Sequence, residues 1–358
     1  MIRKIGTRTL ELTDIPRIIG FGSAVGKKEG EGPLSLWFDK IYTDTTMGGE
    51  TWEKAEAALQ KEAVQLAIES GCVESNNIDM IFAGDLLNQC ISSSYGLRDY
   101  GIPFLGQYGA CSTMAQTLAM AAISAESGAA NIAAAVTSSH FCSAERQFRY
   151  PLQYGGQRTP TAQWTVTGAG CAIAASYSDG RFLSAHDAIT KYGDQNIKSQ
   201  IGISRVCVGK IVDMGITDAN NMGAAMAGAA ADTIAAFLSD TGTTQNDYDL
   251  ILTGDLGKVG SDLLYELLGR DNVDICDKHK DCGLLIFDTD TQDVHAGGSG
   301  CGCSASVLCS YIMKRMRKRE LNNVLFVATG ALMSPTIVQQ GESIPGIAHA
   351  VNIINCTE

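Results

Sequence analysis

The amino-acid sequence predicts an α/β protein built from two copies of the same arrangement of helices and strands. The chain has 358 residues and 45% of them are hydrophobic, which is enough to bury one large core or two medium-sized ones. Short apolar runs alternate with longer helical stretches, a pattern typical of parallel β/α units. An internal repeat then assigns residues 1–180 to one half and residues 181–358 to the other.

The first part of the repeat aligns residues 51–86 with residues 221–256 without a gap, at an offset of 170. In each copy we expect a helix, over residues 53–70 and 222–239, because apolar side chains recur there at helical spacing. A polar turn and a strand follow, over residues 78–86 and 248–256. Both predicted strands end in Gly-Asp-Leu.

The second part aligns Cys111-Ser112 with Cys303-Ser304, and residues 133–137 with residues 325–329, at an offset of 192. The larger offset leaves an excess of 22 residues in the second half, within residues 258–302. This excess is a candidate lid over a pocket. Two copies of such units predict duplicated layers packed face to face, although chance similarity between two β/α units is an alternative explanation.

The composition excludes several classes of protein. With 39 acidic and 27 basic residues the net charge is −12, which argues against a nucleic-acid partner because phosphates would be repelled. Twelve scattered cysteines in a well-cored chain indicate reduced thiols and synthesis in the cytoplasm. We expect neither a signal peptide nor a transmembrane segment, because the first ten residues are polar and the longest uncharged run is rich in Ala.

Cys111 is the candidate nucleophile of the chain. It follows a glycine turn at Gly109 and precedes an Ala-rich stretch with helical character. The free N–H groups and positive dipole at a helix N-terminus favour a thiolate, so we expect a lowered pKa for this thiol and a place for an anion.

Several motifs carry a resemblance to known families. The two repeated halves, Cys111 at the start of a central helix and the glycine turn at residues 297–302 resemble the thiolase and condensing-enzyme superfamily. Within it, the chain is similar to the stage V sporulation protein AD family. The segments that carry this closer similarity are residues 84–89, 138–140, 144–151, 154–157, 328–332 and 334–336. The polar stretch at residues 185–204 has no place in the family pattern.

The resemblance implies a thiolase-like, five-layered α/β/α/β/α fold and a role in bacterial spore formation. It implies a homodimer without cofactors that binds dipicolinic acid, free or as its calcium chelate. It also implies peripheral attachment at the inner membrane of the developing spore, together with membrane proteins of the same sporulation complex. We therefore predict a non-enzymatic binding protein that serves dipicolinic acid uptake.

Thioester condensation by a cysteine needs a thiolate, an oxyanion hole and His or Asn side chains that move protons. By the resemblance, those side chains would stand at Gly254-Asp255 and within Ser299-Gly300-Cys301, so both expected partners are missing. His279 and His295 are candidate displaced bases, or structural histidines. Two alternative functions stay open: a divergent acyl-transferring condensing enzyme that uses Cys111, and a scaffold for membrane partners.

A buried dianion such as dipicolinate needs several hydrogen-bond donors. We expect one set of donors at the start of the helix that follows Gly109, and a second set from residues 146–150. The alternative for the arginines of this second segment is a solvated or dimer-facing loop. The resemblance adds donors in the glycine turn and at the positions of the oxyanion hole. The predicted ligand-binding residues are Cys111, Ser112, Thr113, Arg146, Arg149, Tyr150, Ser299, Gly330 and Ala331.

Two further patterns have plain explanations. His279, Cys282, Cys301 and Cys303 match no standard zinc spacing, so we expect no metal site. The basic run at residues 314–319 ends a predicted helix, where cations complement the dipole; contact with anionic lipid is the alternative.

Overall fold

The computed structural model describes residues 1–148, 158–177 and 200–356. Its main sheet has 13 strands, and the order along its length is symmetric about the middle. The first half contributes β6 (Phe104–Gly106), β5 (Met80–Gly84), β7 (Ile132–Ser139), β9 (Gly168–Ala175) and β3 (Arg17–Val25). The second half contributes β10 (Gln200–Cys207), β15 (Gly346–Cys356), β14 (Asn323–Ala331), β11 (Leu250–Thr253) and β12 (His279–Asp281). The halves meet where Arg17 of β3 pairs with Gly202 of β10.

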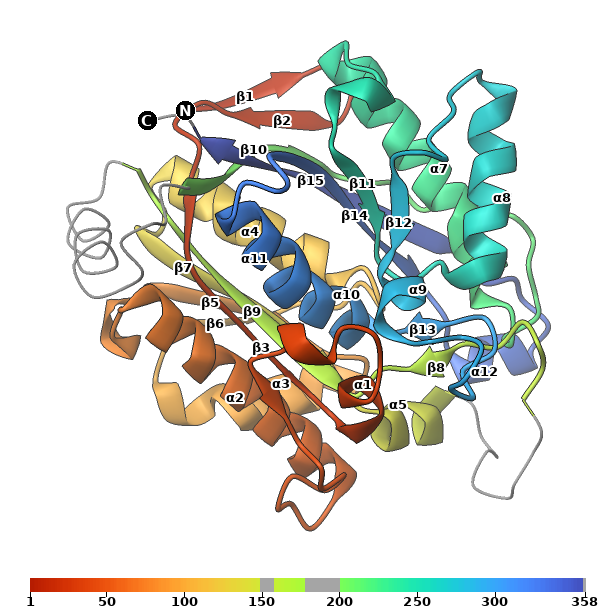
Figure 1. The fold of residues 1–358 in the computed structure, drawn as a ribbon, viewed down its shortest axis with the longest axis horizontal. Helices are drawn as coiled ribbons and strands as arrows, with labels where there is room; N and C mark the ends of the chain where they lie inside the picture. The colour runs from red at the N-terminus through yellow and green to blue at the C-terminus, as the bar shows by residue number, and fades with distance from the viewer. Residues whose placement is uncertain (149–157, 178–199, 357–358) are drawn as a thin grey trace.

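The elements form the five layers that the sequence predicts (Figure 1). One outer layer contains α2 (Trp52–Gly71) and α3 (Ile91–Leu97), and the other contains α7 (Met222–Thr241) and α8 (Gly257–Arg270). Between the half-sheets lie α4 (Thr113–Ser127), α10 (Cys301–Val307), the π-helical turn Leu308–Ile312 and α11 (Met313–Arg317). Helix α4 packs against strands of both half-sheets, so the middle layer is shared.

The remaining elements are short. They are β1 (Ile2–Ile5), β2 (Thr9–Leu12), β4 (Lys40–Ile41), β8 (Trp164–Thr165) and β13 (Gly298–Ser299), with helices α1 (Lys27–Gly30), α5 (Phe141–Phe148), α9 (Cys282–Ile286) and α12 (Pro335–Gln339). Single 3-10 turns cover Ser35–Trp37, Ser75–Asn77, Asn88–Cys90, Arg98–Tyr100 and Gln245–Asp247.

The structure confirms the internal repeat. Helices α2 and α7 both have 20 residues and their bounds differ by the predicted offset of 170. Their N-caps are also equivalent, because the side chains of Thr51 and Asn221 accept hydrogen bonds from the N–H groups of Lys54 and Ala224. At the second offset, β7 falls on β14. The boundary predicted at residue 180 lies outside the described residues.

Small residues let the outer helices approach the sheet closely. A Cβ atom at Gly20 of β3 would lie 2.3 Å from the carbonyl oxygen of Ala67 on α2, so only glycine fits there. Helix α7 is long and apolar enough to cross a membrane by length and composition, but 72% of its apolar window is buried inside the structure. It packs on β14, β15 and α8, as a core helix does. The twelve cysteines are all free thiols.

The 22-residue excess does not form a lid, which corrects the prediction. It is taken up by α8, β12 and α9. Strand β12 extends the edge of the sheet beside β11, and α9 packs against α10, so apolar contacts draw this segment into the layers. None of its described residues before Ser299 lines the pocket described below.

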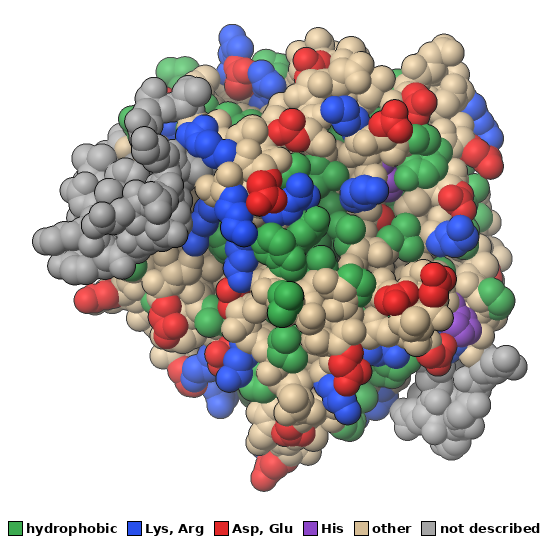
Figure 2. Space-filling view, viewed as in Figure 1, with side chains coloured by type: hydrophobic (Ala, Val, Ile, Leu, Met, Phe, Trp, Pro, Cys, Tyr) green, Lys and Arg blue, Asp and Glu red, His purple; other side chains and the backbone are tan. Residues whose placement is uncertain are grey.

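The basic run at the end of α11 is largely paired within the molecule. Lys314 Nζ lies 2.7 Å from Asp39 Oδ1, and Arg315 Nε lies 3.0 Å from Glu320 Oε2. Arg317 is stacked over the ring of Phe21 at 4.0 Å, and burial lowers its pKa. Acidic side chains lie among the basic ones on this face (Figure 2). These contacts favour the structural explanation of the run over a lipid contact.

Candidate functional site

The turn before α4 is held by its own side chains. The Ser112 hydroxyl donates to the Gly109 carbonyl oxygen at 2.7 Å, and the Thr113 hydroxyl donates to that of Ala110 at 2.6 Å. Gly330 of β14 lies against this turn, since a Cβ atom there would be 2.4 Å from the Gly109 carbonyl oxygen. Ser112 and Thr113, predicted as ligand donors, therefore use their hydroxyls to fix the position of Cys111.

Cys111 has a carboxyl partner, which corrects the expectation that its partners are missing. Asp255 follows β11, is fully buried, and lies beside the Cys111 thiol, since each of the two groups shifts the pKa of the other. It accepts hydrogen bonds from the Gly300 N–H and the Thr329 hydroxyl, each at 2.9 Å. Burial raises the pKa of Asp255 to about 7, against the opposing effect of these donors. The predicted absence of an imidazole or amide at this position holds, but a proton acceptor is present.

The expected low pKa of the Cys111 thiol is wrong. Burial and then the neighbouring Asp255 carboxylate raise this pKa well above its usual value. The reason is that α4 begins at Thr113 and Cys111 is only 7% exposed. Desolvation of a thiolate and repulsion by a carboxylate outweigh the favourable helix dipole, whose effect is at most ~2 kcal/mol. The thiol is therefore neutral near pH 7.

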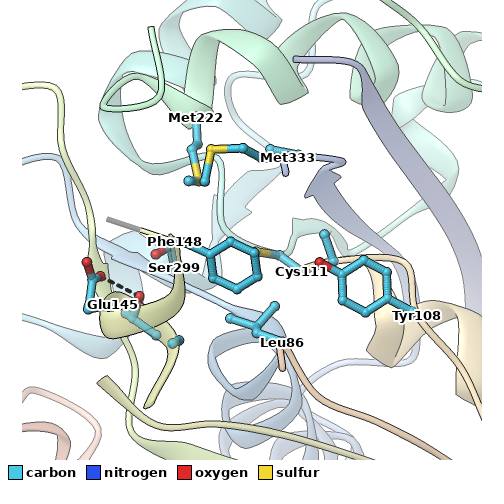
Figure 3. Close-up of a pocket in the computed structure, with 12 residues that line it drawn as sticks. Leu86, Tyr108, Cys111, Glu145, Phe148, Met222, Ser299 and Met333 are labelled. Atoms are coloured by element: carbon cyan, nitrogen blue, oxygen red, sulfur yellow. Dashed lines mark hydrogen bonds between the residues drawn. The ribbon is translucent and has the colours of Figure 1, made fainter. Parts of the chain in front are cut away.

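Cys111 lies at the base of a pocket (Figure 3). The cavity volume is about 30 Å³. Most of its lining is apolar, with Phe148 and Tyr108 as aromatic walls and Met222 and Met333 above the cysteine in the view of Figure 3. The full lining is Leu86, Tyr108, Ala110, Cys111, Ala144, Glu145, Phe148, Thr165, Met222, Ser299, Ala331 and Met333.

A polar corner stands opposite the apolar walls. Glu145 of α5 is 4% exposed and accepts a hydrogen bond from the Thr165 hydroxyl at 2.6 Å. Strand β8 pairs in parallel with β13, and this register sets Thr165 beside Ser299. Parts of both halves of the chain thereby build one site.

The two candidate histidines lie away from Cys111. His279 on β12 is buried, and its ring nitrogens lie 2.8 Å from the hydroxyls of Thr253 and Tyr265. His295 contacts the carbonyl oxygen of Thr159 at 2.7 Å and Asp293 at 3.1 Å. Neither is among the residues that line the pocket, because hydrogen bonds hold each ring elsewhere.

Of the two predicted arginines, the structure describes only Arg146. Arg146 forms an ion pair with Glu53 of α2 and its side chain is 49% exposed, so it does not line the pocket. Arg149 and Tyr150 lie outside the described residues. Of the predicted binding residues, the structure brings Cys111, Ser299 and Ala331 together around the pocket.

A second buried carboxyl group lies behind the pocket. Glu56 of α2 accepts hydrogen bonds from Ser138 at 3.0 Å and Ser143 at 2.6 Å. Burial, reinforced by the nearby Asp85, raises the pKa of Glu56 to about 8. Asp85 in turn accepts from the Ser93 hydroxyl at 2.6 Å. Both Gly-Asp-Leu motifs of the repeat thus place an aspartate in the interior beside the site.

Sequence reasoning missed most of the pocket walls and the role of Asp255. The one available signal was the repeated Gly-Asp-Leu, since a charged residue that ends a buried strand in both copies points to a role inside the fold. Within the described residues, no three His, Cys, Asp or Glu side chains gather as a metal site.

Comparison with known proteins places this chain near one family. The family model described as "Stage V sporulation protein AD (SpoVAD)" matches residues 6–354. The chain is 48% identical over 330 residues to stage V sporulation protein AD of Bacillus subtilis (strain 168), which covers 92% of this chain and 91% of that protein.

Solved structures with a similar fold are condensing enzymes. They include 3-oxoacyl-[acyl-carrier-protein] synthase III from Aquifex aeolicus, with a TM-score of 0.56 and 12% identity over 95% of this chain and 99% of that one. Cerulenin-bound OleA from Xanthomonas campestris has a TM-score of 0.57 and 11% identity, covering 98% of each chain. Human mitochondrial 3-ketoacyl-CoA thiolase has a TM-score of 0.53 and 14% identity over 97% of this chain and 99% of that one. At these identities the likeness establishes the thiolase-like fold.

Proposed function

This chain belongs to the stage V sporulation protein AD family, and on that premise we propose that its Cys111 pocket binds dipicolinic acid, free or as its calcium chelate. Membership gives the chain a role in sporulation. In the proposal, binding serves uptake of dipicolinic acid into the developing spore and involves no chemical change. The observation that carries it is the lining of the pocket, in which a neutral thiol faces aromatic and apolar walls.

The shape and chemistry of the pocket suit a flat aromatic acid. A pyridine ring can pack against the ring of Phe148 and the sulfur atoms of Met222 and Met333. Its carboxyl groups would then lie toward Cys111, Ser299 and Ala331, the predicted binding residues that line the cavity.

Calorimetric titration of the full chain with dipicolinic acid tests the proposal. Phe148→Ala removes one wall of the pocket and should weaken binding by about fivefold or more, since a buried aromatic contact contributes about 1 kcal/mol or more. Tyr95→Ala is the matched control, because Tyr95 is an exposed aromatic residue that does not line the pocket. Equal affinity in both variants would contradict binding at Cys111.

We also propose a homodimer formed through β6. This strand is at the edge of the sheet, and the exposed fractions of Phe104 and Leu105 are 38% and 51%. An apolar edge strand is a ready template for pairing with a second copy. Leu105→Lys should shift sedimentation toward the monomer; an unchanged sedimentation coefficient would exclude β6 from the interface.

Attachment to the inner membrane, through membrane proteins of the same sporulation complex, is the third part of the proposal. Its support is family membership. Fractionation of developing spores should recover the protein with membranes only when those membrane proteins are present. Recovery that is independent of them would contradict docking.

The position of the Asp255 carboxyl beside Cys111 favours a second candidate, acyl transfer in which Cys111 is the nucleophile. Incubation with an acyl-coenzyme A and mass spectrometry of the Cys111 peptide separates the two functions. A thioester on Cys111 that is absent from Cys111→Ala would support the enzyme.

A pure scaffold for membrane partners is the remaining alternative. Such a protein would show no thermal stabilisation by dipicolinic acid. A binding protein should gain about 2.7 kcal/mol of stability when the ligand is at 100 times its dissociation constant.

A further inference from the structure

The Asp255 carboxyl lies directly behind the wall of the pocket. Cys111 lines the cavity, and its thiol lies beside Asp255, whose side chain has no exposed surface. Among the described residues, the hydrogen-bond donors to this carboxyl are the Gly300 N–H and the Thr329 hydroxyl, and both are neutral. A ligand carboxylate that contacts Cys111 would therefore lie close to the Asp255 carboxyl, with the Cys111 sulfur atom between them.

Among the described residues, the titratable groups found to interact with Asp255 are all acids. One of them is Cys111, on the turn before α4, and the others lie on α10 and where β12 meets α9. Burial is the main cause that raises the pKa of each group. The other groups are Cys301, Cys303, Asp281 and Cys282. Glu145 adds a carboxyl at the cavity wall. The raised pKa values keep these thiols neutral near pH 7, so only carboxyl groups can repel an anion here. A dianion entering the pocket would be repelled by an ionised Asp255 in a poorly solvated region, where such repulsion is strong.

We propose that the pocket takes up a proton when it binds free dipicolinate, and that Asp255 is the group that accepts this proton. The inference rests on the proposed function and adds to it the ionisation state in which the ligand is held. Protonation of Asp255 removes the repulsion. It also leaves the Cys111 thiol available to donate to a ligand carboxylate, because a protonated Asp255 attracts the thiol hydrogen less strongly.

The direction of the pH effect follows from linkage. In the free protein the pKa of Asp255 is about 7, so above that pH its carboxyl is mostly ionised. A bound anion raises this pKa further, and the complex then holds more protons than the separate partners. Affinity for free dipicolinate should fall as pH rises above about 7, by up to about tenfold per pH unit.

Calorimetric titration of the full chain with dipicolinic acid at about pH 6.5 and about pH 8 measures this, using two buffers of different ionisation enthalpy at each pH. The difference between the buffers counts the protons taken up. We expect uptake approaching one proton at the higher pH. The uncharged diamide of the same acid has the same ring, so it should bind without this uptake.

Asp255→Asn should abolish the proton uptake and flatten the pH dependence of affinity. Glu29→Gln is the matched control, because Glu29 is a buried carboxyl with a pKa of about 7 that does not line the pocket, and it should leave the uptake unchanged. Binding without proton uptake in the unsubstituted chain would overturn this inference but not the proposed function. This outcome can be observed even if the variants do not fold. Uptake that persists in Asp255→Asn would also overturn it. Absence of binding at both pH values would overturn the proposed function together with the inference.

Discussion

At the scale of single residues, burial controls the ionisation of the groups around Cys111. The thiol has a raised pKa although a helix begins two residues later. Asp255 and Glu56 are acids whose pKa values are raised to about 7 and about 8 by the same cause. The dipole of α4 acts only near its first turn, whereas desolvation acts on the whole charged group and is the larger effect here.

Alkylation of Cys111 tests whether desolvation outweighs the helix dipole at this thiol. Iodoacetamide at about pH 8 should label Cys111 far more slowly than the exposed Cys72, because the thiolate is the reactive form. Asp255→Asn removes the neighbouring carboxylate, which raises the pKa of the Cys111 thiol, and should therefore increase the labelling rate of Cys111. Peptide mass spectrometry gives both rates from one sample. Equal labelling of Cys111 and Cys72 in the unsubstituted chain would contradict the raised pKa.

Glu29 should make stability depend on pH. It is 1% exposed, and burial raises its pKa from 4.5 to about 7 in the folded chain. Between these values the folded state binds the proton and the unfolded state does not, so the free energy of unfolding falls as pH rises. The loss is about 3 kcal/mol by pH 8, and Glu29→Gln should remove it. Denaturant titrations at pH 5 and 8 check this, with Glu31→Gln at an exposed neighbour as control; identical pH dependence in both variants would contradict it.

At the scale of elements, the two halves use the same devices at matching positions. Thr51 and Asn221 cap α2 and α7, each through a hydrogen bond of 3.3 Å to the N–H group three residues later. Different residue types thus perform one function in the two copies, because either oxygen can satisfy a free N–H group at the helix start.

Removal of either cap should have a similar cost. Thr51→Ala and Asn221→Ala should each lower the free energy of unfolding by about 1 kcal/mol, measured by denaturant titration. Asn220→Ala, at the exposed residue beside the second cap, should change it by less than about 0.5 kcal/mol. A loss at Asn220 as large as at Asn221 would argue against capping.

At the scale of the whole molecule, the shared middle layer joins the halves into one cooperative unit. Helix α10 comes from the second half but packs on β3, β7 and β9 of the first. Helix α4 comes from the first half and contacts β14 and β15 of the second. Each half-sheet therefore needs a helix from the other copy to cover its inner face.

Separate fragments of the two halves should show that each half depends on the other for folding. Residues 1–180 and 181–358, produced separately, are expected to lack a cooperative thermal transition because each would expose an apolar sheet face. The intact chain should unfold in one transition, followed by circular dichroism and calorimetry. Two transitions in the intact chain, each matching one fragment, would show independent domains.

The sequence by itself determined the class of fold, the repeat with its 170-residue offset, the bounds of α2 and α7 to within two residues, and the place of Cys111 before a helix. These depend on local periodicity and on self-similarity, which a linear sequence displays. The tertiary structure alone decided that Asp255 reaches the Cys111 thiol, that Arg146 turns to Glu53, and that residues 258–302 pack into the layers. These outcomes depend on which segments, distant in sequence, meet in the interior, and on how completely water is excluded where they meet.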